Sequence, residues 1–521
     1  AAAVAAAVEG PVTSSLPGSA IQPVEESSIG LAGHGLEELK RLKTKAFLAL
    51  ASGQKKAGDG EIPVLVYNPH PYEVETTVEV EFQLPDQNKN PNIFANPLVY
   101  ENGQLLPCQT EHELSNFNVD WRKRSVFTAK LKPGQMNRYD VKIEFIDNPS
   151  APSLPMEGDY LVFTGRDIKA KINTKTGTLD YYEVGGKNYL KAGGCLPLVI
   201  ADDENCWAHK EKSFRNVKGA FRLMTPEESA EFSGILTAEK PAAVRVIEDG
   251  AVRTVVEAVM VYNHSFICLR YYLPKTGTEI KLGCRVYWNE KMTMLKLSLP
   301  TTLTDTAFIG QTSYGSENLL TNGDEMCSHK WNVVAGKEGA LSVINTGTYG
   351  SDCADGELRI SLLRSPGYSA GKSDFSVRKP YIMEQDRFSP FIDQGERYYE
   401  FYINASDAQT RLEKVEREAI LINEAPMALS FFPTGRGELP KSFASLSDDV
   451  ISLAAFKKAE LDDRFILRLF NPTAETRESV LTLPAINKEI KVSLKGYTLR
   501  SFALSLKDGS VTEVDLLERP L

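Results

Sequence analysis

The spacing of apolar residues along the chain changes near residue 60, which divides the sequence into two kinds of structure. Before that point apolar residues recur three or four positions apart, as in Leu36, Leu39 and Phe47, and this spacing is typical of one face of an amphipathic helix. Lysines and arginines follow towards the end of the same segment. We assign residues 1–58 to a helical segment whose apolar face must cover another body.

Local signals suggest where this helix begins and where it is weakest. Pro23 suits the first helical turn, and Ser19 with Gln22 has the spacing of a capping box just ahead of it. Gly33 and Gly35 lower helix propensity in the middle. We therefore expect a helix from about Pro23 that bends or splits at the glycines.

From residue 61 the apolar period falls to two, which is the period of half-buried strands. The first such windows read IPVLVY, TTVEVEFQL and RYDVKIEF. They predict a small β-sandwich over residues 59–148. A stretch rich in proline and serine at 147–159 marks its end.

Strand patterns continue to the C-terminus with only one further helical window. Residues 156–405 show hairpin and strand patterns without a long helical period, and they predict one large antiparallel sandwich. The helical window reads ASDAQTRLEKVEREAILIN and opens the last unit, residues 406–521. Strands about ten residues apart predict a third sandwich there.

Composition narrows the class of partner. The formal net charge is −10, which disfavours a nucleic-acid backbone as ligand, and no run approaches the roughly 20 apolar residues of a membrane span. The chain has seven cysteines, an odd number, without a CxxC pair. We therefore expect no nucleic acid, no membrane, free thiols and a cytoplasmic location.

The usual catalytic signatures are absent: the sequence contains no GxSxG, P-loop, GxGxxG after a strand, or HExxH. The acidic run at 201–204, followed by His209, is the best candidate cation site. A solvated turn is the more common role for such a run.

The window 325–368 combines aromatic and planar polar side chains. Its His329, Trp331, Tyr349 and Arg364 suit the apolar face and the hydroxyls of a sugar. A structural interpretation stays open, in which the two aromatic residues belong to the core and Arg364 forms an ion pair. Composition alone favours that second interpretation.

Several ordered motifs in and around this window resemble the C-terminal β half of glycoside hydrolase family 38, the class II α-mannosidases, without the catalytic barrel. Within the window and just after it they read EMCSHKW, INTGTYGSD, LRISLLRSP and DQGERYYEFYI. The others read LPGSAIQPVEE, VLVYNPHPYE, NTKTGTLDYYEVGGKNYL and FKKAELDDRFILRLFNP. The resemblance covers about residues 16–521.

The resemblance implies a mainly β fold: a short N-terminal helical segment, then three antiparallel sandwiches, the central one a large galactose-mutarotase-like super-sandwich. In the family, the LPGS turn follows a catalytic α/β barrel that holds zinc, an Asp nucleophile and an acidic general acid/base. A zinc-binding His and an Asp precede that turn in the family, whereas Thr13 and Ser14 stand there in this sequence. The resemblance therefore implies no catalytic residue and no metal ligand in this chain, and an inactive chain on its own.

The implied function is that of the C-terminal portion of a zinc-dependent retaining α-mannosidase, acting as scaffold and active-site rim. Arg364 would contact the substrate, with Tyr349 and Asp352 behind it. The implied partners are an α-mannoside oligosaccharide and a catalytic barrel, on the same or a separate chain, with a homo-oligomer as a further expectation. A stand-alone glycan-binding sandwich protein and a structural oligomerisation module are the alternatives.

Overall fold

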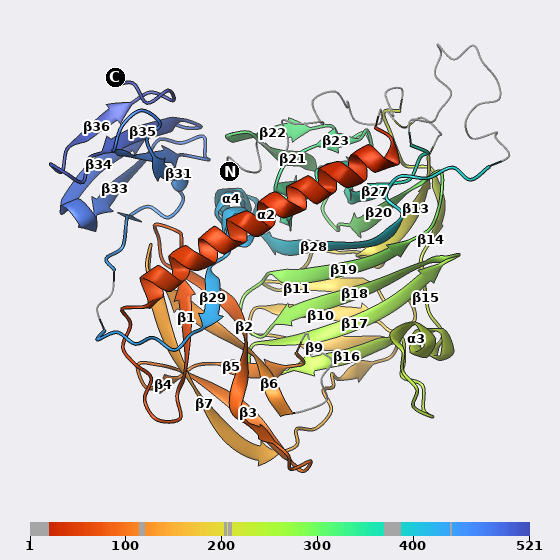
Figure 1. Ribbon diagram of the computed structural model, residues 1–521. Helices are drawn as coiled ribbons and strands as arrows, with labels where there is room; N and C mark the ends of the chain where they lie inside the picture. The colour runs from red at the N-terminus through yellow and green to blue at the C-terminus, as the bar shows by residue number, and fades with distance from the viewer. Residues whose placement is uncertain (1–19, 114–119, 203–205, 207–210, 369–386, 438–439) are drawn as a thin grey trace.

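The described part of the chain forms one long helix, two shorter helices and three strand-built bodies (Figure 1). The computed structural model describes residues 20–113, 120–202, 206, 211–368, 387–437 and 440–521. The paired strands of its sheets run antiparallel to one another. The predicted mainly β, antiparallel fold is therefore confirmed.

The N-terminal helix, α2 (Gln22–Ala51), is continuous over 30 residues, so the expected break at the glycines does not occur. Its N-cap residue is Ile21, which makes no side-chain capping bond. The predicted capping box is wrong, because Gln22 already lies in the first turn, where its amide donates to Glu26. Ser19 lies outside the described residues.

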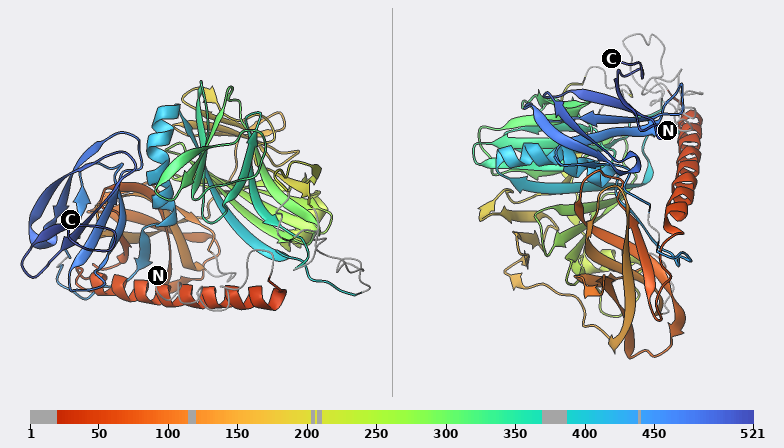
Figure 2. Two further views of the ribbon diagram at one scale, coloured as in Figure 1. Left: turned by 90° about the horizontal axis from the view of Figure 1, so that it is seen from above. Right: turned by 90° about the vertical axis from the view of Figure 1, so that its left-hand side faces the viewer.

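The two halves of α2 have different surroundings. Near its C-terminal end Phe47 and Ala51 are buried against Leu65 and Met136 of the first sandwich. Farther towards the N-terminus, Leu36 on the same apolar face is 53% exposed. At 1.5 Å per residue the helix is roughly 45 Å long. It runs along the outside of the molecule from the first sandwich to the far end of the large one (Figures 1 and 2).

The first sandwich packs two sheets, with strand orders β29-β1-β7-β3-β4 and β2-β6-β5, around a core that includes Phe127 and Tyr139. Its strands are β1 (Ile62–Tyr67), β2 (Val74–Asn88), β3 (Ile93–Glu101), β4 (Gln104–Leu105), β5 (Cys108–Glu111), β6 (Asp120–Leu131), β7 (Met136–Asp147) and β29 (Met427–Ser430). β29 comes from the range that the sequence assigned to the last sandwich. The chain therefore returns to the first sandwich before it enters the last.

The large sandwich has a ten-stranded and a six-stranded sheet around one core, with a smaller five-stranded sheet against the same core. The ten strands are β15 (Arg222–Leu223), β16 (Val244–Asp249), β17 (Arg253–Tyr262), β18 (Ser265–Pro274), β19 (Ile280–Trp288), β21 (Ala307–Thr312), β22 (Gly315–Leu319), β24 (Trp331–Gly336), β25 (Gly339–Asn345) and β28 (Gly395–Ser406). Their path is β15-β17-β18-β19-β28-β25-β24-β21-β22, and β16 pairs with β17.

The six-stranded sheet follows the order β14-β13-β20-β27-β26-β23 and carries the predicted site residues. Its strands are β13 (Leu196–Ala201), β14 (Val217–Ala220), β20 (Thr293–Pro300), β23 (Met326–Cys327), β26 (Gly350–Ala354) and β27 (Glu357–Arg364). The five-stranded sheet consists of β8 (Met156–Glu157), β9 (Tyr160–Thr164), β10 (Ile168–Asn173), β11 (Leu179–Val184) and β12 (Lys187–Asn188).

The last sandwich pairs a three-stranded with a four-stranded sheet. Its elements are β30 (Ser445–Leu446), β31 (Ser452–Lys458), β32 (Phe465–Phe470), β33 (Arg477–Leu483), η3 (Pro484–Ile486), β34 (Lys488–Leu494), β35 (Leu499–Leu504) and β36 (Val511–Val514). Across the junction with the large sandwich, Tyr314 meets Phe470 edge to face, with ring centroids 5.4 Å apart.

Two shorter helices cover opposite ends of the ten-stranded sheet. α3 (Pro226–Ser233) begins with a capping box at Thr225, and α4 (Ala408–Asn423) contacts β24 and β25. The Trp331 indole N–H of β24 donates to Glu416 of α4 at 2.7 Å. In the described part of the chain, no helix is both long and apolar enough to cross a lipid bilayer.

Arg253 fixes the first sandwich against the large one. Its guanidinium donates twice to Glu111 and once to Glu79, each at 2.7 Å, and the side chain is almost fully buried. The Gln109 side-chain oxygen accepts the Arg253 backbone N–H at 2.9 Å. Burial alone would raise the pKa of Glu79, but Arg253 and Arg124 outweigh it and hold that pKa at about 2. The contact therefore stays ionised at neutral pH.

His70 makes the first sandwich sensitive to acid. The ring is buried and bonds to the Glu424 carbonyl oxygen at 3.1 Å, and burial lowers its pKa from 6.5 to about 4. The unfolded chain therefore binds the proton more readily, so stability that is complete above pH 6.5 is lost as the pH falls towards 4.

We expect His70→Gln to reduce this acid-induced loss in the free energy of unfolding by about 3 kcal/mol or less. Chemical unfolding curves at several pH values between about 4 and 7 measure this loss in the parent protein and in the variant. Equal losses in the two proteins would contradict the role of His70.

Candidate functional site

Arg364, the last residue of β27, lies at one end of the six-stranded sheet. Its Nε and Nη2 atoms each lie 2.8 Å from a different carboxylate oxygen of Asp202, which follows β13 and has a fully buried side chain. The third nitrogen, Nη1, donates to the Cys206 carbonyl oxygen at 3.4 Å. The guanidinium also lies over the Phe214 ring, 5.3 Å from its centroid. A two-point ion pair and an aromatic support hold the planar group in one orientation. About a fifth of the side chain stays accessible.

The turn at residues 393–395 closes around this end of β27. Asp393 adopts a left-handed φ of 55° and accepts the Arg364 backbone N–H at 3.3 Å. Burial raises the pKa of its carboxyl. Gln394 donates to the Ser365 hydroxyl at 3.2 Å, and the buried Trp288 indole donates to the same hydroxyl at 2.6 Å. The motif that begins DQG therefore supports the backbone beside Arg364, a role that the sequence did not reveal.

The start of α2 reaches the same place. The Tyr368 hydroxyl bonds to the Glu25 carboxylate, and burial followed by this bond raises the pKa of Tyr368. Figure 1 shows the N-terminal end of α2 beside the end of the sheet that carries β27. The structure thus brings Glu25 of the motif LPGSAIQPVEE to Tyr368 in the segment after LLRSP, which lies more than 300 residues away in the sequence.

Asp352 lies deeper in the sheet than Arg364. It is fully buried on β26, opposite Arg359, which is five residues or roughly 16 Å before Arg364 along β27. Its carboxylate pairs with the fully buried Lys296 at 2.5 Å and with Arg215. Both oxygens therefore bind protein cations.

Tyr349 lies at the same end of the sheet as Arg364, directly before β26. Its side chain is 51% exposed, and its ring meets His329 edge to face with centroids 6.2 Å apart. Trp331, in contrast, is buried in the contact with α4. Of Trp331 and Tyr349, only Tyr349 is therefore accessible to a ligand. Arg364 forms the ion pair that the structural interpretation predicted.

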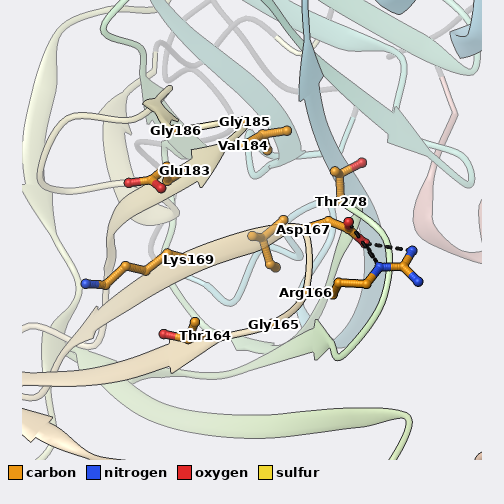
Figure 3. Close-up of a pocket in the computed structure, with 11 residues that line it drawn as sticks. Thr164, Gly165, Arg166, Asp167, Lys169, Glu183, Val184, Gly185, Gly186 and Thr278 are labelled. Atoms are coloured by element: carbon orange, nitrogen blue, oxygen red, sulfur yellow. Dashed lines mark hydrogen bonds and ion pairs between the residues drawn. The ribbon is translucent and has the colours of Figure 1, made fainter.

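A surface cavity of about 560 Å³ lies elsewhere, between the β9–β10 and β11–β12 turns (Figure 3). Its lining includes an ion pair of Arg166 with Asp167, and Asp167 also accepts the Gly277 backbone N–H at 2.7 Å. None of Arg364, Tyr349 and Asp352 lines it. Arg166 and Asp167 neutralise each other, and Glu183 accepts the Tyr181 hydroxyl.

The acidic run at 201–204 and His209 fall mostly outside the described residues. Asp202 is described and is the partner of Arg364. Among the described residues, no three side chains of His, Cys, Asp or Glu cluster as metal ligands.

Residues 168–372 match the family described as glycosyl hydrolases family 38 C-terminal domain. This part of the chain therefore carries that domain, and the resemblance drawn from the motifs is confirmed. No curated protein matches the chain.

Two solved structures share the fold over 93% of this chain. One is a protein in glycosyl hydrolase family 38 from Enterococcus faecalis, with 12% identity, a TM-score of 0.65 and 62% of its own length covered. The other is an alpha-mannosidase from Enterococcus faecalis V583, with 12% identity, a TM-score of 0.62 and 59% of its length covered. The chain thus spans about three fifths of each.

Asp352 gives a direct test of the buried ion-pair network. Asp352→Asn removes the charge that balances Lys296 and Arg215, so we expect a loss of about 3 kcal/mol or more in the free energy of unfolding. Asp305→Asn is the matched control, because the Asp305–Lys337 pair is exposed and should cost under about 1 kcal/mol. Chemical unfolding measures both, and equal small losses would show that the network adds little.

Proposed function

We propose that this chain supplies the C-terminal portion of a retaining, zinc-dependent α-mannosidase and forms part of the rim of its active site. The substrate class is terminal α-D-mannosides. The family match and the shared fold support this proposal, and the alpha-mannosidase among the similar structures suggests the substrate. The activity belongs to the complete protein, because this chain spans only part of those relatives.

The observation that carries the proposal is the meeting of the start of α2 with the end of β27. If a catalytic barrel precedes α2, its last residues arrive beside Tyr368, one short turn from Arg364. The accessible fifth of the Arg364 side chain then faces the barrel. The exposed apolar residues of α2, such as Leu36, are then covered by the same body.

In this proposal Arg364 orients the substrate. An arginine presents fixed N–H donors to sugar hydroxyls, and the ion pair with Asp202 keeps the guanidinium from turning. Tyr349 offers an aromatic ring at the same end of the sheet. Asp352 acts from behind by holding Arg215 and Lys296, because its own carboxylate is enclosed.

Zinc, in this proposal, belongs to the barrel and fixes sugar hydroxyls there. The described residues of this chain do not fit a zinc site, because they contain no cluster of three or more potential ligands. Their proposed contribution is limited to orientation of the substrate and support of the rim.

We propose a cytoplasmic location, because Cys195, Cys284 and Cys353 are buried as thiols. A homo-oligomer formed through exposed sheet edges remains part of the proposal. The second candidate function is a non-catalytic glycan-binding sandwich protein, which the exposed Tyr349 beside Arg364 also suits.

Intact mass of the protein purified from its source separates the two candidates. The α-mannosidase proposal expects a species heavier than the 57.6 kDa of this sequence, or a second polypeptide, with α-mannosidase activity in added zinc. A lone species of that mass without such activity would contradict it and favour glycan binding.

Arg364→Lys in the complete enzyme tests the role of the guanidinium. Lysine keeps a cation beside Asp202 but loses the fork of N–H donors, so we expect kcat/KM on an aryl α-mannoside to fall about 10-fold or more. Arg359→Lys is the matched control, because Arg359 is a half-buried residue of the same strand that pairs with Glu357. Equal kinetics in both variants, with thermal midpoints unchanged, would remove Arg364 from the rim.

A further inference from the structure

Three neighbouring strands of the ten-stranded sheet, β18, β19 and the first half of β28, carry exposed side chains on one face, among them Arg270, Arg285 and Tyr398. Alternate residues such as Leu269, Leu282 and Phe401 point into the core, so the residues between them face outwards. Helices cover the parts of the sheet on either side: Phe232 of α3 stacks on Phe266, and α4 packs on β24, β25 and the part of β28 near Tyr402. Figure 1 shows β18 and β19 between α3 and α4.

We call this exposed region the open face and define it by its outward side chains. They are Arg270, Tyr272, Lys281, Arg285, Tyr398 and Glu400.

Tyr398 is the most exposed ring of the open face, at 58%. A Cβ atom added to Gly283 would lie 3.1 Å from the Tyr398 hydroxyl and 3.6 Å from a Tyr272 ring carbon. Tyr398 lies opposite Arg285, which is two residues from Gly283 on β19. The side chain of Tyr398 therefore crosses diagonally over Gly283. The absence of a side chain at Gly283 thus lets the phenol lie along the sheet.

Hydrogen bonds hold this ring in place. The Tyr398 hydroxyl donates to Glu400 at 3.0 Å, and Lys281 pairs with the same carboxylate at 2.7 Å. The Lys281 ammonium also lies 5.3 Å from the centroid of the Tyr272 ring. A ligand would therefore meet an aromatic platform that is already ordered, which lowers the entropy cost of binding.

The charges of the open face are balanced. Arg270 pairs with Glu257 at 2.9 Å, Arg285 pairs with Glu396, and Lys281 pairs with Glu400. An anionic ligand would have to compete with these carboxylates. The apolar surface of the open face consists of aromatic rings that are separated by polar groups. It therefore lacks the contiguous apolar centre of a stable protein interface.

We propose that the open face binds a neutral oligosaccharide chain, whose apolar ring faces stack on Tyr398 and whose hydroxyls bond to the paired charged groups around it. Phenol rings suit the C–H faces of sugars, and carboxylates and guanidinium groups offer acceptors and donors to hydroxyls. This inference does not depend on the α-mannosidase proposal, because Arg364 belongs to the other sheet of the sandwich.

Calorimetric titration of the 521-residue chain with neutral and charged probes tests the inference. Neutral α-mannohexaose and cellohexaose are compared with a sulfated hexasaccharide of the heparin type. We expect at least one neutral probe to bind with a dissociation constant on the order of 0.1–1 mM. Tyr398→Ala should weaken that binding about 10-fold or more, whereas Tyr398→Phe, which keeps the ring, should stay within about 3-fold.

Phe145→Ala is the matched control, because Phe145 is an exposed ring on a strand of the first sandwich. It should leave binding unchanged, and circular dichroism should show that every variant is folded. The inference is overturned if no neutral probe binds at about 10 mM, if Tyr398→Ala binds as tightly as the parent, or if only the sulfated probe binds. Self-association that Tyr398→Ala abolishes, without sugar binding, would show a protein interface instead.

Discussion

Arg253 is the contact on which the arrangement of the molecule depends most. It joins β17 of the large sandwich to Glu111 and Glu79 of the first sandwich, with almost no access to water. A single buried guanidinium with three carboxylate contacts has few alternative geometries, so it specifies how the two sandwiches meet. The first sandwich in turn anchors Phe47 of α2, and the length of that helix carries its other end to Tyr368.

The six-stranded sheet contains buried ion pairs at two positions, one deep in the sheet and one at its end. Deep in the sheet, Lys296 and Asp352 are enclosed and neutralise each other, which stabilises the sheet but leaves no group for a ligand. At the end of β27, Arg364 pairs with an equally buried carboxylate, and yet about a fifth of its side chain stays accessible. The position along the strands therefore decides which charged side chain remains accessible from solvent.

The sequence predicted the architecture well because the apolar periods are local. It identified the strand-rich bodies and the long helix, and the ordered motifs led to the family 38 C-terminal domain that residues 168–372 match. It did not predict that β29 pairs with β1 of the first sandwich. The sequence of a four-residue strand does not specify which distant strand it will pair with. The glycines in α2 did not break the helix, since propensity costs of about 1 kcal/mol are small against the rest of a 30-residue helix.

The candidate site was harder to predict because its geometry depends on distant pairs. Arg364 was chosen from its motif, but its partner Asp202 lies 162 residues away. Register keeps Tyr349 at the same end of the sheet as Arg364 but places the buried Asp352 opposite Arg359, in different surroundings. A crystal structure of the complete enzyme with a mannose-derived inhibitor tests the account most directly. We expect an Arg364 nitrogen within about 3 Å of a ligand oxygen; an inhibitor bound in the barrel with Arg364 turned away and separated from it by other residues would contradict the account.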